Sequence, residues 1–326
     1  MFGNPQRSIT DWIDIWANSA SVSPASRATY AAKAKRCIIL MKRMKPDIQF
    51  DNLSAQDFID LRNALDNGEI LNHRGAHMSN YTINLYMAVM RLFYAFIAKQ
   101  GHPNPTIGVK NLKVRKTYNK KPLTIEQART LIGSIDTTTQ KGRRDKAIVL
   151  LMLVYGLRSC EVERIDISDI ELDGESIFLH IQRKGHKEKD AKIRIEPQVY
   201  AVYQEYMKGR SKAKTGPAFI SYQPKDKYRD RRMDVRGIEK MVERRLVATG
   251  IKNEFGRNVI CTHSLRHTAA VIMLESGAPL DEVRYMLGHT DCRTTETYVA
   301  YAQELKMMSN PPSKYVVHSL GLVKEY

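Results

Sequence analysis

The spacing of apolar residues predicts helices in the first part of the chain. Near the N-terminus such residues recur at intervals of three and four, which gives a short helix one apolar stripe. They are Ile9, Trp12, Ile13 and Trp16. Three further helices are expected, over 26–44, 53–65 and 79–101. Pro46 follows the first of them, and Gly101 ends the last. Four helices in succession predict a bundle.

The periodicity stops after this bundle. The segment 101–122 is rich in proline and lysine, and we place a linker in its second half, at 113–122. This basic linker is either a solvated tether or a segment that follows a nucleic-acid backbone. A length of 326 residues also favours two domains. We therefore expect a helical domain over 1–112 and a second domain over 123–326.

The second domain combines helices with one β-hairpin. Thr124 is a suitable cap for the helix that follows it. Apolar residues then alternate on both sides of a turn rich in glycine and lysine, which is typical of a hairpin. They are Ile177, Leu179, Ile181, Ile193 and Ile195. Other helices are expected over about 145–155, 235–248, 263–276, 280–287 and 294–301. The expected fold class is mainly α with a small β component, a helical N-terminal domain plus a mixed α/β domain.

The composition restricts the class of protein. No run approaches the roughly 18 uninterrupted apolar residues of a membrane helix, and the N-terminus lacks the features of a secretion signal. We therefore expect a cytoplasmic protein with no membrane partner. The formal charge of +17 favours a polyanionic partner such as nucleic acid. The four cysteines form no C-x-x-C pair, so neither a zinc site nor a disulfide framework is indicated.

Four short segments, far apart in the sequence, contain residues suited to handling a phosphodiester. They are YGLRSCEVERI around Arg158, QRKGHKEK around Lys184, THSLRHT with His263 and Arg266, and LGHTDCRTTETYVAY with His289 and Tyr298. Each segment is weak by itself, because such an arginine or lysine is usually a surface charge and a tyrosine is usually a packing residue. Their order along the chain is more specific than any one of them.

In this order the segments resemble the tyrosine recombinase, or phage integrase, family over nearly the whole chain. The resemblance implies a catalytic set that consists, in chain order, of Arg158, Lys184, His263, Arg266, His289 and Tyr298. It also implies that the helical domain is a core-binding domain on DNA and that the second domain is catalytic. No cofactor is expected, since the enzyme would conserve the energy of the broken bond in a phosphotyrosine.

The residue types fit this chemistry. The planar guanidinium groups of Arg158 and Arg266 can bind the nonbridging oxygens of one phosphate and stabilise the added charge of a pentacoordinate transition state. His263 and Arg266 are three positions apart on an expected helix, so they share a face. Tyr298 would attack phosphorus, with an accepting imidazole such as His263 assisting. Lys184 is the best candidate to protonate the departing 5′-oxygen.

Some assignments have rivals. Lys187 and Lys189 lie in the same hairpin as Lys184, and Tyr301 competes with Tyr298, although its distance from L-G-H fits the family less well. His289 resembles the family's phosphate-bonding position. Glu161, one turn after Arg158, is expected either to orient the site without acting directly in the reaction or to be a surface or capping carboxylate.

Other classes of function share parts of this residue pattern. His263 and His267 have the i, i+4 spacing of helical metal ligands, but the glutamate of H-E-x-x-H is missing and Arg266 lies between them, so no metal is expected. A type IB topoisomerase shares the tyrosine chemistry and relaxes DNA without pairing sites. A DNA-binding regulator on the same scaffold would lack catalysis, which the complete residue set argues against.

The resemblance also implies how the protein assembles. Two protomers would bind inverted repeats in double-stranded DNA as a homodimer, and two dimers would form a homotetramer that exchanges strands through a Holliday junction. Integration or excision, inversion and multimer resolution all remain open. After SNPPS at 309–313, an apolar cluster within 315–323 is expected to be a C-terminal docking tail. It would pack either on its own catalytic domain or on a neighbouring protomer.

Overall fold

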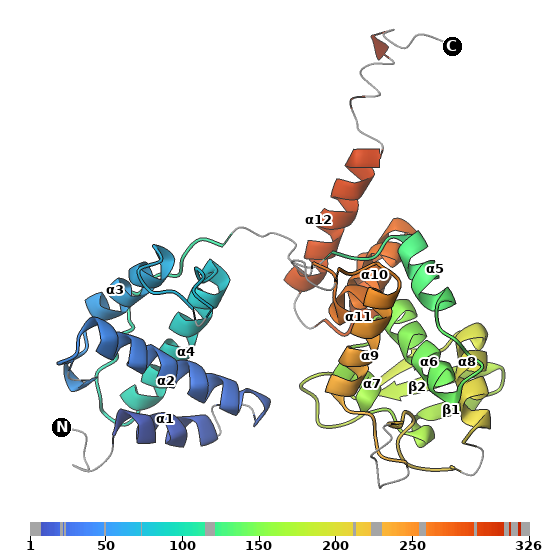
Figure 1. Ribbon diagram of the computed structural model, residues 1–326, viewed down its shortest axis with the longest axis horizontal. Helices are drawn as coiled ribbons and strands as arrows, with labels where there is room; N and C mark the ends of the chain where they lie inside the picture. The colour runs from blue at the N-terminus through green and yellow to red at the C-terminus, as the bar shows by residue number, and fades with distance from the viewer. Residues whose placement is uncertain are drawn as a thin grey trace. The chain divides into compact units, whose positions relative to one another are not determined.

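The computed structural model divides into two compact units, Met1–Thr117 and Tyr118–Tyr326. The residues that it describes are 8–19, 22, 24–48, 50–72, 74–114, 121–210, 213–222, 230–253, 259–289, 292–309, 313 and 319–320. Figure 1 shows the helices and strands of both units. The apolar tail cluster expected within 315–323 falls outside the described residues apart from Ser319 and Leu320.

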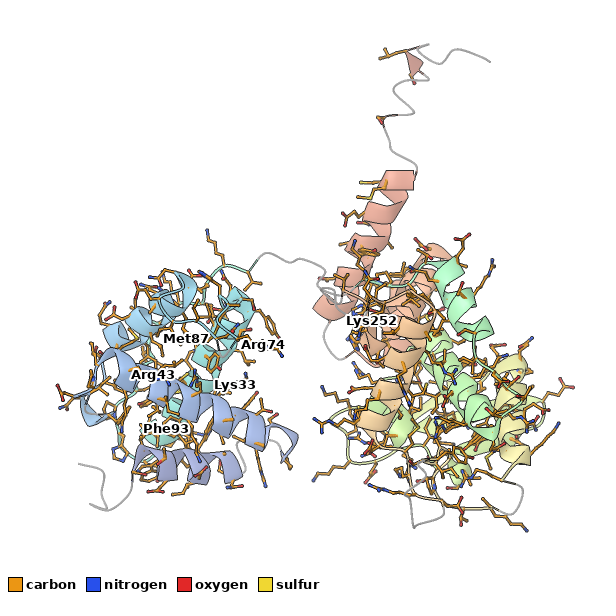
Figure 2. The ribbon with its side chains drawn as sticks, viewed as in Figure 1. Lys33, Arg43, Arg74, Met87, Phe93 and Lys252 are labelled. Atoms are coloured by element: carbon orange, nitrogen blue, oxygen red, sulfur yellow. The ribbon has the colours of Figure 1, made fainter. Side chains whose placement is uncertain are left out.

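The first unit is helical. Its α-helices are α1 (Ile9–Asn18), α2 (Arg27–Met44), α3 (Ala55–Asp66) and α4 (Asn80–Ala98), with 3-10 turns at Pro24–Ser26 and Phe50–Asn52. Ser8, Ser54 and Ser79 cap three of these helices by accepting a hydrogen bond from a backbone N–H of the first turn. The apolar faces meet in one core, to which α4 contributes Met87 and Phe93 (Figure 2).

Helix α4 is long and apolar enough, by length and composition alone, to cross a membrane. The core helix of a compact domain passes the same test. Seven residues of α4, including Ile83, Met90 and Ile97, are buried in the core of the first unit. The packing therefore accounts for its apolar character.

The second unit combines helices with a small sheet. Its α-helices are α5 (Ile125–Gly133), α6 (Gln140–Val154), α7 (Ser159–Glu163), α8 (Pro197–Lys208), α9 (Val235–Ala248), α10 (Thr262–Glu275), α11 (Leu280–Leu287) and α12 (Cys292–Ser309). A 3-10 turn at Ile167–Asp169 leads into strands β1 (Ile170–Asp173), β2 (Ser176–Ile181) and β3 (Ala191–Arg194). The strands are antiparallel in the order β1-β2-β3, and Leu179 of β2 pairs with Ile170 and with Ile193.

Helix α6 is central to this unit, since it packs against α5, α7, α8, α9 and α10. Its buried side chains, such as Ile148 and Met152, belong to the large core of the second unit. Helix α12 packs against α10 and α11 and then extends away from the unit (Figure 1). This arrangement brings the end of α6, the β2–β3 turn and the start of α10 toward one region.

The sequence expectations describe most of these helices and strands but miss three, α7, β1 and α8. Helix α7 has only five residues, too few to show an apolar period. Strand β1 has only four residues, half of them exposed, and so shows no alternation. Helix α8 begins with Pro197 and is rich in aromatic and β-branched residues, which are weak helix formers; its packing against α6 stabilises it. Helix α6 begins at Gln140 rather than about 145, because its polar first turn is capped by Thr139 and carries no apolar pattern. Helix α12 extends eight residues beyond the expected end at 301.

Candidate active site

Arg158 lies at the N-cap of α7, directly after the sharp bend at the end of α6. Gly156 forms this bend with a φ of 62°, and a Cβ there would lie 2.4 Å from Cδ2 of Leu287. The Nη1 of Arg158 donates to Oε1 of Glu161 at 2.9 Å, and its backbone N–H donates to Oε2 at 2.9 Å. The side chain of Arg158 remains 22% exposed, so its guanidinium is both oriented and accessible.

Glu161 is the fully buried carboxylate of this region. Besides Arg158, it accepts a hydrogen bond from the backbone N–H of Lys184 at 3.4 Å, and its Oε2 lies 4.0 Å from Nη1 of Arg266. The alternative that Glu161 is a surface carboxylate is therefore wrong, because its exposed fraction is 0%. Glu161 caps α7 and also contacts the three segments that carry Arg158, Lys184 and Arg266.

Arg266 is buried in the first half of α10. Its Nη1 donates to the carbonyl of Gly156 at 2.6 Å, and its Nη2 donates to the carbonyl of Leu287. One guanidinium therefore ties α10 to the bend before Arg158 and to the end of α11. Burial, together with the neighbouring Arg158, lowers the pKa of Arg266 to about 10, which leaves it charged at neutral pH.

The rings of His263, His267, Tyr298 and His289 form a continuous aromatic cluster. The His263 and His267 rings are 4.8 Å apart between centroids, and the His267 and Tyr298 rings are 5.0 Å apart. On the other side, His289 stacks on Tyr298 at 5.9 Å with an interplanar angle of 12°. Tyr298 is only 3% exposed, within a small cluster that α10, α11 and α12 build.

The electrostatic surroundings keep these histidines neutral. Burial, and then the charge of Arg266, lowers the pKa of His263 to about 4 and that of His289 to about 3. Burial lowers the pKa of His267 to about 4, assisted by His263 and Arg266. An imidazole whose pKa is this low is uncharged at pH 7. Burial raises the pKa of Tyr298, while Arg266 and Arg158 act in the opposite direction.

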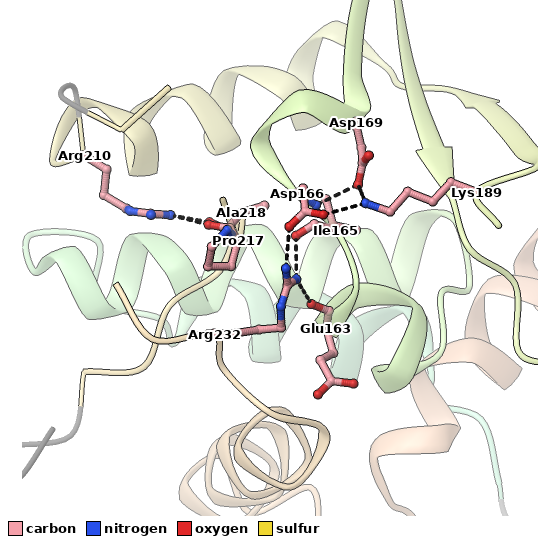
Figure 3. Close-up of polar contacts among 9 residues, drawn as sticks. All are labelled: Glu163, Ile165, Asp166, Asp169, Lys189, Arg210, Pro217, Ala218 and Arg232. Atoms are coloured by element: carbon pink, nitrogen blue, oxygen red, sulfur yellow. Dashed lines mark hydrogen bonds and ion pairs between the residues drawn. The ribbon is translucent and has the colours of Figure 1, made fainter. Parts of the chain in front are cut away.

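Lys184 lies in the exposed turn between β2 and β3. Its charge acts on His263, whose pKa it helps to lower, so the turn faces the same electrostatic centre. Lys189, one rival, instead forms ion pairs with Asp166 at 2.7 Å and with Asp169 (Figure 3). Lys187 is exposed in the turn. Because its ammonium group is already ion-paired, Lys189 is a weaker candidate than Lys184 for the proton donor.

The comparison with protein families decides the identity of this arrangement. The model of the phage integrase family matches residues 121–304, which is more than half of the chain. The chain belongs to the phage integrase family. Its similarity to named relatives agrees: it is 27% identical over 277 residues to the tyrosine recombinase XerD of Staphylococcus epidermidis, covering 82% of this chain and 88% of that one. It is 28% identical over 239 residues to the tyrosine recombinase XerC of Chlamydia trachomatis, covering 71% and 70%.

Solved structures share the fold. One is the XerH site-specific recombinase bound to a palindromic difH substrate in a post-cleavage complex, with a TM-score of 0.69 at 18% identity over 93% of this chain and 84% of that one. Another is the Tn1549 transposon integrase in complex with transposon right end DNA, with a TM-score of 0.65 at 16% identity over 93% and 99%. The expected fold class, mainly α with a small β component, is confirmed.

Membership in this family makes the chain a tyrosine recombinase, an enzyme that cleaves and rejoins DNA. A topoisomerase and a non-catalytic regulator are not favoured. Within the residues that the structure describes, no group of three or more His, Cys, Asp or Glu could hold a metal ion.

Tyr301, the rival of Tyr298, lies in a different environment on α12. Burial and the nearby carboxylates of Glu304 and Glu275 raise its pKa, and negative charge would repel a phosphate. Tyr298 instead lies near the charges of Arg266 and Arg158. The charges that act on Tyr298 are therefore positive, whereas those that act on Tyr301 are negative.

Arg183 is a residue of this site that the sequence expectations missed. It is 5% exposed, and its Nη1 lies 3.7 Å from Oε2 of Glu161. A signal was present, because Ile177, Leu179 and Ile181 alternate inward along β2 and Arg183 continues the same period of two. An arginine at an inward position is rare enough to mark a functional region.

Proposed function

We propose that Tyr298 is the nucleophile of this recombinase. Its oxygen would attack a DNA phosphorus, forming a 3′-phosphotyrosyl bond as the bond between phosphorus and the 5′-oxygen breaks. The tyrosine proton would pass to His263, and Lys184 would protonate the departing 5′-oxygen. A 5′-hydroxyl from the partner strand would then reverse the step and rejoin the DNA.

The phosphate would be held by the charged residues around this ring. Arg158 and Arg266 would bind its nonbridging oxygens, His289 would donate a further hydrogen bond, and Glu161 would orient Arg158. One observation carries the proposal: the Tyr298 ring lies against His267 and His289, close to Arg266, although these residues come from three different helices or their ends.

The direct test is a covalent trap. We expect the wild-type protein to become linked to a DNA duplex nicked near its cleavage site, in excess EDTA and without ATP, because arginines rather than metal ions neutralise the phosphate. Gel electrophoresis after denaturation measures the adduct, and sequencing the trapped DNA identifies the target. Cleavage that requires added metal would contradict this mechanism.

The assembly that we propose follows from this chemistry. Two protomers would bind inverted repeats as a homodimer, and two dimers would form a homotetramer that resolves a Holliday junction, in the cytoplasm. The palindromic substrate of the related XerH structure supports an inverted-repeat site. Integration or excision, inversion and multimer resolution use the same steps.

A groove on the second unit supports a docking role for the C-terminal tail. Its volume is about 740 Å³, and its lining includes Ile125, Ile132, Met273 and Met286. These apolar walls match the apolar residues of the tail sequence, within 315–323. Docking of the tail of a neighbouring protomer there would couple cleavage to assembly.

A basic cavity supports binding of the DNA backbone. It has a volume of about 640 Å³, and six of its lining residues are positively charged. They are Lys141, Arg144, Arg231, Arg232, Lys240 and Arg244. One of its lining residues, Glu243, accepts a hydrogen bond from the backbone N–H of Thr262, the residue before His263.

Removing two of these charges should change the salt dependence of binding. Lys240 and Arg244 are exposed on α9, so the double variant Lys240→Ala, Arg244→Ala should fold normally. We expect weaker DNA binding and a plot of log affinity against log salt whose slope is shallower by about 2, because about one counterion is released per phosphate contact. Fluorescence anisotropy measures this slope. Lys208→Ala, on α8, is the control, and equal slopes for the double variant and wild type would remove the cavity from the DNA interface.

A further inference from the structure

Arg183 lies where three parts of the active site meet. Its Nη2 donates to the carbonyl of Met286 at 2.8 Å and to that of Tyr285 at 3.4 Å, in the last turn of α11. Its Nη1 lies 3.7 Å from Oε2 of Glu161, the carboxylate that orients Arg158. Arg183 also directly precedes Lys184. One side chain therefore connects the β2–β3 turn to α7 and to the end of α11.

The backbone closes tightly over this side chain. Helix α11 ends at Gly288, whose left-handed φ of 61° disfavours other residues. A Cβ on Gly288 would lie 2.8 Å from Nε and 2.9 Å from Cδ of Arg183. The guanidinium is therefore held in one place, directly before the backbone that presents His289.

The position of Arg183 is costly for a packing residue. Its side chain is 6% exposed, and its Nη1 has no hydrogen-bond partner among the described residues. Burial, and then the charge of Arg158, lowers its pKa even though Glu161 acts in the opposite direction. Burying an incompletely paired cation costs free energy that an apolar side chain of similar length would avoid. Packing alone therefore does not explain an arginine here.

We propose that Arg183 is a positioning residue for Lys184, fixing the β2–β3 turn so that the lysine ammonium reaches the departing 5′-oxygen. This role rests on the proposed function of Lys184 as the general acid. The two hydrogen bonds from Nη2 to α11 and the approach of Nη1 to Glu161 fix the residue next to Lys184 in two directions. A fixed neighbour limits the positions that the exposed lysine can reach.

The other contacts of the β2–β3 turn and of the end of α11 show which of them depends more on Arg183. Two further hydrogen bonds hold the end of α11: Arg266 donates to the carbonyl of Leu287, and Nε of Arg284 donates to the carbonyl of His289 at 3.1 Å. The far arm of the hairpin is held by Lys189, through its ion pairs with Asp166 and Asp169 (Figure 3). The near arm has the 3.4 Å bond from the Lys184 backbone to Glu161. Losing Arg183 should therefore displace Lys184 more than His289.

The test compares two leaving groups in one DNA sequence. A thiolate is a much weaker base than an alkoxide, so a substrate with sulfur in place of the bridging 5′-oxygen needs no proton from a general acid. We expect Arg183→Met to slow single-turnover cleavage of the ordinary substrate by about 10²-fold, the effect of losing a general acid. The sulfur substrate should be cleaved within a few-fold of the wild-type rate, and Lys184→Ala should show the same pattern.

Arg210→Met is the matched control. Arg210 is similarly buried and donates to the carbonyls of Pro217 and Ala218, each at 2.8 Å, but it contacts none of the candidate catalytic residues among the described contacts (Figure 3). We expect it to lower the melting temperature without distinguishing the two substrates. If Arg183→Met does not fold, Arg183→Lys takes its place, because it retains the charge but not the planar guanidinium. We expect Arg183→Lys to slow cleavage of the ordinary substrate by a smaller factor and to leave cleavage of the sulfur substrate near the wild-type rate.

Two results would overturn this role. Equal slowing of both substrates by the Arg183 variants would mean that Arg183 binds the phosphate or is only structural, and a wild-type rate on the ordinary substrate would mean that Lys184 does not depend on it. Either result would leave the proposed function intact. Failure of the wild-type protein to form a covalent complex with either substrate would instead reject the proposed function, and this role with it.

Discussion

Tyr298→Phe is expected to abolish covalent attachment to a nicked DNA substrate. The substitution removes the one oxygen that would bond to phosphorus and leaves the ring that packs against His267 and His289. The ring also packs with Ala270, Val283 and Leu287, so phenylalanine should fit the same space, with the loss of the hydroxyl's interaction with Arg266. DNA affinity should stay within a few-fold of wild type, since the charged groups are unchanged.

Tyr301→Phe provides the matched control on the same helix. It removes a hydroxyl one turn away, in surroundings that Glu304 and Glu275 make negative, and should leave the amount of covalent adduct unchanged. Denaturing gels measure the adduct, and mass spectrometry of the digested complex identifies the modified tyrosine. A persistent adduct in Tyr298→Phe, or its loss in Tyr301→Phe, would transfer the nucleophile to another residue.

Much of the site could be predicted because the family motifs are local. H-x-x-R places His263 and Arg266 on one face of α10 from spacing alone, and the left-handed glycine of L-G-H ends α11 just before His289. The hairpin could be predicted from alternation, since Leu179 and Ile193 are paired in the sheet. Each of these features depends on neighbours within a few residues.

Features that depend on tertiary packing could not be predicted in this way. The burial of Glu161 requires the hairpin and α10 to approach α7 from distant parts of the sequence. The proximity of His267 to Tyr298 depends on how α12 packs on α10, which no motif specifies. The period of two along β2 marks Arg183 as an inward position, but its partners at the end of α11, about 100 residues away, could not be predicted. Spacing identifies candidates, whereas packing determines which of them meet.

Arg158→Ala and Arg266→Ala are each expected to slow cleavage by about 10²-fold or more at saturating DNA, comparable with the loss of a preorganised oxyanion donor. The two variants should differ in stability. Arg266 donates to the buried carbonyls of Gly156 and Leu287, and leaving these acceptors unpaired should cost about 1–3 kcal/mol for each carbonyl. Arg158 is partly exposed, and the Glu161 that it leaves still lies near Arg183 and Arg266.

Single-turnover cleavage and thermal unfolding together separate chemistry from stability. Cleavage is measured well below the melting temperature of each variant, so that the folded fraction is the same. Arg210→Ala, which also unpairs two backbone carbonyls, should lower the melting temperature as Arg266→Ala does but cleave at the wild-type rate. Arg158→Ala should reverse this pattern, with a small loss of stability and a large loss of rate. Normal cleavage by Arg158→Ala or Arg266→Ala would remove that arginine from the phosphate site, because a permanently charged group facing the transition state cannot be deleted without slowing the reaction.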